Sequence, residues 1–345
     1  MQKSLPSARI YYRATHAIVD ILRALKRNKG VKRVLIPAIV CPSVIFAARF
    51  SSLDIFLVDI DLKNGCLNYK QIPSDFLNNE TALVFVELFG CTAISEEVQK
   101  FCNLNSIHLL IDAAQSNFFA KRRFNKFETI IFSFGKKKQI EIGFGSIVFS
   151  NVFSNSETSI CKIPTSYHKS FFSRFYQNLY YAHKSIDNKI LAQFLGTKMH
   201  LLYKTDVVQP PMKAELKEYL EKISDKNIFE QNRKINLNDY LSEFSGLKNL
   251  NIITKNQNEI YWRFSFLVDG RKTQQNILQA LRKEEIHASA WYPCLEKYVY
   301  DNEILGSGIK NSKIFESGIV NLWLTDDNGI KCNPKLAKSI IEEYV

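Results

Sequence analysis

The chain has little of what would support a metal centre, a disulfide framework or a membrane span. Its seven cysteines are scattered and odd in number, they form no Cys-x-x-Cys pair, and its six histidines show no ligand spacing. The longest apolar stretch, residues 34–50, is interrupted by Pro37 and Pro42, which is not typical of a transmembrane helix. We therefore expect no metal site, no structural disulfide and no membrane-spanning segment.

The first residues also lack the apolar core of a secretory signal, since Met1 to Pro6 lead directly to Arg9. Together with the scattered cysteines, this pattern predicts a protein of the reducing cytoplasm. Of the 345 residues, 46% are hydrophobic and 23% are charged. The chain is therefore long enough for two domains and can bury a sizeable core.

The net charge of +12 is compatible with nucleic acid, a membrane surface or a polyanionic small molecule as partner. Residues 162–206 hold seven Lys or Arg against two acids and are rich in Tyr and Phe. Such a segment could stack bases or lie on a membrane, or it could pack its aromatic side chains on its own protein or on a twin subunit. We expect the segment to pack on its own protein or on a twin subunit, and we expect no nucleic acid as partner. A peripheral membrane contact through residues 167–203 is the alternative.

Two apolar runs end in side chains that suit one aromatic cofactor. Asp112 ends the run 107–111, and Lys136 to Lys138 follow the run 128–132. Pyridoxal phosphate needs an amine to hold its aldehyde and a carboxylate to keep its ring nitrogen protonated. As strands of a sheet covered on both faces, these runs would place Asp112 at the carboxyl edge, where ligands bind. On residue type alone, a helix cap for Asp112 and a solvated loop for the lysines remain open.

The spacing of these motifs resembles that of the DegT-type (DegT/StrS) aminotransferases, which act on nucleotide-linked keto-sugars. Members carry a D-A-A-Q segment, an F-S-F strand, a lysine five residues after that serine, and a Gly-x-Gly turn beginning five residues after the lysine. This chain has Asp112 to Gln115, Phe132 to Phe134, Lys138 and Gly143 to Gly145 in the same register. The resemblance selects Lys138 among the three lysines.

The segment from Ala14 to Leu25 resembles the family's G-T-x-A-L opening, where a helix N-terminus receives the cofactor phosphate. Its apolar residues recur at helical spacing, Thr15 can cap the helix, and Gly30 can end it. A helix N-terminus with free amides is an anion site. An ordinary capped helix is the alternative.

Four positions depart from the family pattern. Cys41 lies near the position where members commonly carry an aromatic residue that stacks on the cofactor ring, and Ala14 replaces the opening glycine. The usual Gly-Glu-Gly-Gly reads Gly143 to Ser146. Finally, Gln209 to Met212 replace an Asn-Tyr-Arg segment, whose asparagine in the family reaches the cofactor phosphate of the neighbouring subunit.

The resemblance implies an α/β fold of the type I pyridoxal phosphate transferase kind. We expect a large, mostly parallel sheet domain in residues 1–210, which includes a basic aromatic helical insert at 151–209. A linking helix and a small C-terminal α+β domain would occupy residues 211–345. Within that part the pattern predicts a helix that follows Pro210 and Pro211 and ends near residue 244, strands at 250–253 and 261–268, and helices at 273–282 and 334–344.

The resemblance also implies roles for single residues in a ping-pong transamination. Lys138 would hold the cofactor and later move a proton, and Asp112 would keep the ring nitrogen charged. The remaining cofactor contacts would be Gln115 near the ring hydroxyl, Cys41 at the ring, and Ala14, Thr15 and Ser133 at the phosphate.

The implied partners are a keto-sugar on a nucleotide diphosphate, an amino donor such as glutamate, and a second copy in a homodimer. The product would serve the biosynthesis of surface polysaccharide or a related glycan. Two alternatives remain: a relative with drifted chemistry, such as a dehydratase or an inactive paralogue, or a basic module that binds nucleic acid or membrane. Dehydratases of this family carry histidine in place of the lysine, so Lys138 argues against dehydration.

Overall fold

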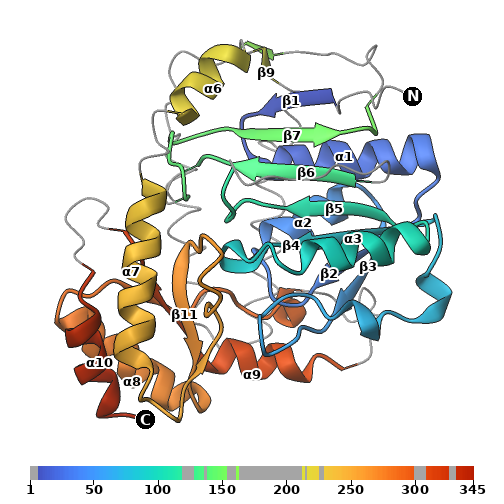
Figure 1. The fold of residues 1–345 in the computed structure, drawn as a ribbon. Helices are drawn as coiled ribbons and strands as arrows, with labels where there is room; N and C mark the ends of the chain where they lie inside the picture. Colours follow the sequence, from blue (N-terminus) through green and yellow to red (C-terminus); the bar gives the residue numbers. More distant parts are fainter. Residues whose placement is uncertain are drawn as a thin grey trace.

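The computed structural model describes residues 7–118, 128–135, 138–153, 161–162, 212–213, 216–224, 229–298, 308–325 and 332–345. Its largest unit is a seven-stranded sheet with the order β1-β7-β6-β5-β4-β2-β3 (Figure 1). The strands are β1 (Ser7–Tyr11), β2 (Arg33–Pro37), β3 (Asp54–Val58), β4 (Thr81–Val86), β5 (His108–Asp112), β6 (Glu128–Ser133) and β7 (Ser146–Ser150). The neighbouring strands β3, β2, β4, β5 and β6 pair in parallel. Strand β7 lies between β6 and β1 and is antiparallel to both.

The central strands β4 and β5 are buried along their whole length. Helices α1 (Ala14–Lys29) and α2 (Ser43–Phe50) cover one face of the sheet and α3 (Ser95–Leu104) lies on the other (Figure 1). Burial on both faces explains why these strands read as continuous apolar runs rather than as an alternating pattern. The predicted mostly parallel α/β sheet is confirmed.

Helix α1 ends as predicted but begins differently. Gly30 adopts the left-handed conformation, with φ 70°, and its N–H donates to the Leu25 carbonyl. The N-cap is Arg13, and no side chain in the described part of the chain caps the first turn. The expectation that Thr15 caps this helix is wrong, because Thr15 already lies inside its first turn.

A second sheet of four antiparallel strands has the order β10-β11-β13-β12. Its strands are β10 (Asn251–Ile252), β11 (Arg263–Leu267), β12 (Ala288–Ser289) and β13 (Ile319–Trp323), and the helices near it are α7 (Phe229–Phe244), α8 (Gly270–Lys283), α9 (Lys310–Gly318) and α10 (Pro334–Glu342). On α7, Tyr240 stacks on Phe264 of β11 with ring centroids 4.8 Å apart. These elements confirm the predicted C-terminal strands and helices.

The helix predicted after Pro211 is described as two stretches, α6 (Leu216–Ser224) and α7, and α7 ends at the predicted residue. Two short strands, β8 (Cys161–Lys162) and β9 (Met212–Lys213), pair in parallel. Most of the predicted aromatic insert at 151–209, including 167–203, lies outside the described residues. The predicted domain boundary near residue 210 therefore stays a prediction. Within the described ranges, every helix is too short or too polar to cross a bilayer.

A buried carboxylate joins the two sheets. Asp59, just after β3, is 3% exposed. Its oxygens accept hydrogen bonds from the backbone N–H of Asn311 at 2.9 Å and of Ser312 at 2.8 Å, and from the Ser312 hydroxyl at 2.6 Å. A negative charge at a helix N-terminus satisfies free amides and favours the helix dipole. Asp59 thus caps α9 and holds the second sheet at the carboxyl edge of the first.

Candidate active site

Asp112 occupies the carboxyl end of β5, in the centre of the large sheet. Its side chain is 7% exposed, and its Oδ1 accepts a hydrogen bond from the Ala114 N–H at 3.0 Å. Residues 113–118 form turns rather than a helix. The alternative that Asp112 caps a helix is therefore wrong for the described part of the chain.

Lys138 lies opposite this carboxylate. Its side chain is half-buried rather than fully solvated, so the solvated-loop alternative is wrong for this lysine; Lys136 and Lys137 fall outside the described residues. Burial lowers the pKa of the Lys138 amine and nearby Arg263 lowers it further, whereas Asp112 and Cys41 oppose the shift. Burial raises the pKa of Asp112, and the charge of Lys138 opposes that change. The two groups thus form one electrostatic pair inside a poorly solvated site.

Gln115 connects three segments at the edge of the site. Its Oε1 accepts from the Phe89 N–H at 2.9 Å, and its Nε2 donates to the Tyr292 hydroxyl at 2.8 Å. The side chain is 4% exposed. Its amide is thus held between the loop after β4 and the segment after β12. The expectation that Gln115 approaches a ring hydroxyl stays a prediction.

Further hydrogen bonds attach residues 260–262 to the same edge. The Nε2 of Gln139 donates to the carbonyls of Gln115 at 2.6 Å and of Ile260 at 3.0 Å. The Trp262 N–H donates to the Phe89 carbonyl at 2.7 Å. Gly90 leaves room for this approach, because a Cβ there would lie 2.8 Å from the Ile260 oxygen at a φ of +94°.

These bonds bring to Lys138 two neighbouring residues that the sequence did not indicate: Trp262, just before β11, and Arg263, the first residue of β11. The Lys138 amine lies 5.6 Å from the centroid of the Trp262 ring. The guanidinium of Arg263 lies 4.1 Å from the Trp262 ring centroid and 3.9 Å from that of Trp323, distances at which cation–π attraction stabilises the stack. An aromatic strand is ordinarily core, so no sequence signal distinguished Trp262 as a site residue.

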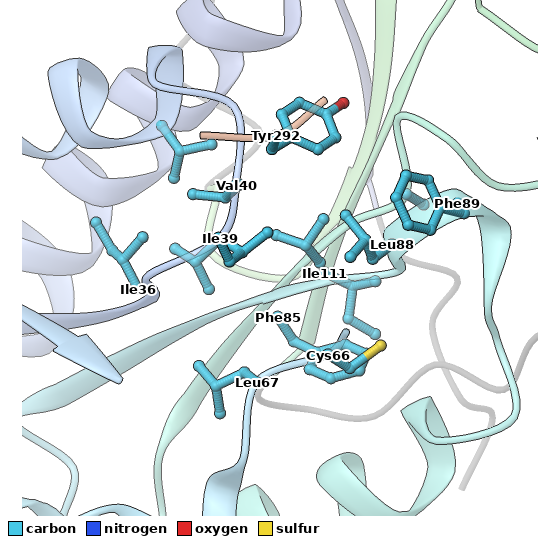
Figure 2. Packing of buried hydrophobic residues seen from close by; sticks show 14 of the residues in the cluster. Ile36, Ile39, Val40, Cys66, Leu67, Phe85, Leu88, Phe89, Ile111 and Tyr292 are labelled. Atoms are coloured by element: carbon cyan, nitrogen blue, oxygen red, sulfur yellow. The ribbon is translucent and has the colours of Figure 1, made fainter. Parts of the chain in front are cut away.

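Cys41 lies half-buried after β2, and its sulfur accepts a hydrogen bond from the Ser43 hydroxyl at 3.1 Å. Tyr292, from the second sheet's side, lies beside Ile39 and Val40 at the end of the same strand (Figure 2). Leu295 N–H donates to the Ala38 carbonyl at 2.8 Å and keeps that segment in place. Burial raises the pKa of the Tyr292 phenol well above its usual value, so the phenol stays neutral. The place of Tyr292 at the site was not predicted from the sequence.

The three predicted phosphate residues meet at one corner. The Gly145 N–H donates to the Tyr12 carbonyl at 2.9 Å, and the Phe134 N–H donates to the Gly145 carbonyl at 2.9 Å. The start of α1, with Ala14 and Thr15, therefore lies near Ser133 at the end of β6. An uncapped helix N-terminus beside hydroxyl groups is chemically suited to a phosphate.

The donor set as a whole fits pyridoxal phosphate. A half-buried lysine interacts electrostatically with a buried carboxylate, and the described structure shows no side-chain cap at the start of α1, which leaves amides that could receive a phosphate. No group of three His, Cys, Asp or Glu side chains within the described ranges could hold a metal ion.

The sequence model of the DegT/DnrJ/EryC1/StrS aminotransferase family matches residues 11–328. The chain belongs to this family. As a member it is a pyridoxal phosphate-dependent aminotransferase, as the resemblance of its motifs indicated. A comparison with curated protein sequences finds no match.

Solved structures of DegT-family and related enzymes have the same fold. An aminotransferase of the family from Brucella abortus has a TM-score of 0.64 at 14% identity, over 99% of this chain and 86% of that one. PseC from Helicobacter pylori is an aminotransferase involved in the biosynthesis of pseudoaminic acid. It has a TM-score of 0.66 at 15% identity, over 99% of this chain and 87% of PseC. The GDP-4-keto-6-deoxy-D-mannose-3-dehydratase from E. coli, with bound hydrated PLP, has a TM-score of 0.66 at 13% identity, over 98% and 88%. The predicted type I fold is confirmed.

Proposed function

We propose that this aminotransferase converts a keto-sugar carried on a nucleotide diphosphate to the amino-sugar, with glutamate as amino donor, in the cytoplasmic biosynthesis of a surface polysaccharide or related glycan. The observation that carries the proposal is the pairing of Lys138 with Asp112 beside the Trp262 ring. The family, and the sugar-related role stated for PseC, support a sugar substrate.

Lys138 has two tasks in this proposal. Its amine would hold the cofactor through the cofactor's aldehyde, and once an amino donor has freed the amine, it would carry the proton to and from the reacting carbon. A pKa lowered by burial suits both tasks, because a larger share of the amine is neutral near pH 7. Pyridoxal phosphate held in this way would supply the electron sink that the proton transfer needs.

Asp112 stabilises the charge on which the electron sink depends. Its carboxylate is buried among apolar strands, where an interaction with a protonated ring nitrogen is weakly screened. Ala14, Thr15 and Ser133 would bind the phosphate, Gln115 would approach the ring hydroxyl, and Cys41 would contact the ring.

Trp262 favours a cyclic substrate. A substrate carbon that receives a proton from Lys138 must lie close to that amine, and the indole is 5.6 Å from it. The apolar C–H face of a sugar ring packs well on such a flat aromatic surface. The net charge of +12 also suits a diphosphate, since basic proteins concentrate anionic substrates.

The proposal predicts two separable half-reactions. Cofactor-loaded protein mixed with glutamate alone should lose the visible absorbance of the aldehyde form and release one equivalent of 2-oxoglutarate. Addition of a nucleotide-linked keto-sugar should restore that absorbance and yield an amino-sugar, which mass spectrometry detects. A nucleotide-linked sugar without a keto group is the control and should leave the absorbance unchanged. A product that has lost water and gained no nitrogen would instead indicate a dehydratase.

We also propose that the chain acts as a homodimer whose sites include the insert at 151–209. Light scattering at working concentration should give twice the chain mass, and a fully active monomer would refute the proposal. A Lys138→Ala chain mixed with a chain altered within 167–203 should recover part of the activity through one intact hybrid site. Without such recovery, each subunit builds its own site, and the insert is better explained as a membrane or partner surface.

A further inference from the structure

Ser146, the first residue of β7, carries a hydroxyl that the proposed roles leave unused. The residue is 0% exposed, and its Oγ has no hydrogen-bond partner among the described residues. Hydroxyls removed from water normally find a partner, because an unsatisfied one loses its hydration without compensation. A buried hydroxyl without a partner in the protein is therefore a candidate for a ligand contact.

The strand register shows which way this hydroxyl faces. Ser146 lies directly opposite Ser133 of β6 and directly opposite Tyr11 of β1. Side chains directly opposite each other in antiparallel strands project from the same face of the sheet. The Tyr11 hydroxyl donates to Asp20 of α1 at 2.6 Å, so this is the face that α1 covers. Ser146 therefore projects toward α1, between Tyr11 and Ser133.

The start of α1 lies at the same end of β7. Gly145, the residue before Ser146, donates its N–H to the carbonyl of Tyr12, two residues before the helix begins. The first turn of α1 has no side-chain cap in the described part of the chain. The start of α1 thus lies at the end of the sheet that carries the Ser133 and Ser146 hydroxyls, and Thr15 lies in its own first turn.

We propose that the Ser146 hydroxyl donates a hydrogen bond to the phosphate of the cofactor. The inference rests on the proposed site at Lys138 and Asp112 and extends it by one binding residue. It also accounts for two departures from the family pattern. Ser146 stands at the last position of the family's Gly-Glu-Gly-Gly segment, so this chain has a hydroxyl where the family has a glycine. Gln209 to Met212 lack the asparagine that, in the family, reaches the phosphate of the neighbouring subunit. One subunit would thereby hold the phosphate with its own residues.

The test compares two ligands that differ only in the phosphate. Pyridoxal phosphate and pyridoxal are titrated into wild-type protein and into Ser146→Ala, and binding is followed by absorbance. Because Ser146→Ala removes a hydrogen bond to a charged group, the variant should bind pyridoxal phosphate about tenfold to a hundredfold more weakly than the wild type. The affinity for pyridoxal should be unchanged. The ³¹P resonance of the bound phosphate should also shift in the variant, which is a readout that does not depend on turnover.

Ser150→Ala is the matched control. Ser150 lies on the same strand and face as Ser146 and is also 0% exposed, but its hydroxyl is 2.6 Å from the Thr129 hydroxyl. This variant should lose stability and keep the wild-type ratio of the two affinities. Because a ratio is measured on the same protein sample, partial unfolding of a variant affects both ligands alike.

Three outcomes overturn the inference. If Ser146→Ala binds pyridoxal phosphate as the wild type does, the hydroxyl is not a phosphate contact. If both ligands weaken equally, Ser146 acts through packing alone. If wild-type protein binds pyridoxal phosphate at neither Lys138 nor any other site, the proposed cofactor site fails and the inference fails with it, which the wild-type titration alone reveals.

Discussion

Replacing Lys138 with alanine should abolish transamination, with a loss on the order of 10⁴-fold or more, because the amine serves both as the covalent attachment and as the proton carrier. Its surroundings support this size of effect. The amine interacts electrostatically with the Asp112 carboxylate and lies 5.6 Å from the Trp262 ring centroid, and burial lowers its pKa. The measurement is borohydride reduction of cofactor-loaded protein followed by peptide mapping, which should place the pyridoxyl group on Lys138.

The neighbouring lysines provide the control for this experiment. Lys136→Ala and Lys137→Ala remove the same charge from the same segment and should keep the adduct on Lys138 and most of the turnover. The Lys138→Ala protein should still bind the cofactor without a covalent bond, because the phosphate residues and Asp112 are intact. An adduct on Lys136 or Lys137, or no adduct in cofactor-saturated wild-type protein, would contradict the assignment.

The second large effect is expected at Asp112. Asp112→Asn preserves the shape of the side chain and its acceptor for the Ala114 N–H but removes the negative charge. We expect the covalent bond at Lys138 still to form and the proton-transfer step to slow by about 3–5 kcal/mol, the usual cost of breaking a buried charge pair. Single-turnover kinetics with glutamate, compared with the amount of adduct formed, separates these two effects.

Asp59→Asn is a suitable comparison for Asp112→Asn. Asp59 is also a buried carboxylate at the carboxyl edge of the large sheet, but its oxygens bind the start of α9. Its replacement should lower the free energy of unfolding. Asparagine keeps a side-chain oxygen that can accept from the α9 amides and so keep the second sheet in place, and the turnover of the folded protein should therefore be largely unchanged. If Asp112→Asn behaves in the same way, with near-normal turnover, Asp112 serves only to hold its own turn.

The site depends on both sheets, and the hydrogen bonds explain how they are joined. Gln139 follows Lys138 by one residue, and its Nε2 donates to the Gln115 and Ile260 carbonyls. Arg233 of α7 donates to the carbonyl of Gln139 at 2.7 Å, so α7 also contacts this junction. The position of Lys138 is thus coupled to that of Trp262 by a short chain of buried bonds, and a movement of the second sheet would alter the surroundings of the amine.

The sequence by itself determined the fold class, and it predicted Asp112 and Lys138 as the central pair of the proposed site. Continuous apolar runs indicate strands buried on both faces, and the runs that end at Asp112 and Ser133 became β5 and β6. Among the three lysines, the resemblance of the D-A-A-Q segment, the F-S-F strand and the Gly-x-Gly turn to the family's register selected Lys138 as the predicted attachment site. Gly30 was recognisable as the end of α1 because a left-handed residue at that position favours glycine.

The tertiary structure alone decided which distant residues complete the site. Trp262, Arg263 and Tyr292 are more than a hundred residues from Lys138 in the sequence. Nothing in the sequence distinguishes the two aromatic residues from ordinary core residues, or the arginine from an ordinary surface residue. Whether Thr15 or Arg13 precedes the first helical turn depends on backbone geometry that residue preference does not settle. The direction of the Ser146 hydroxyl depends on strand register, because a shift of one residue would turn it to the opposite face of the sheet.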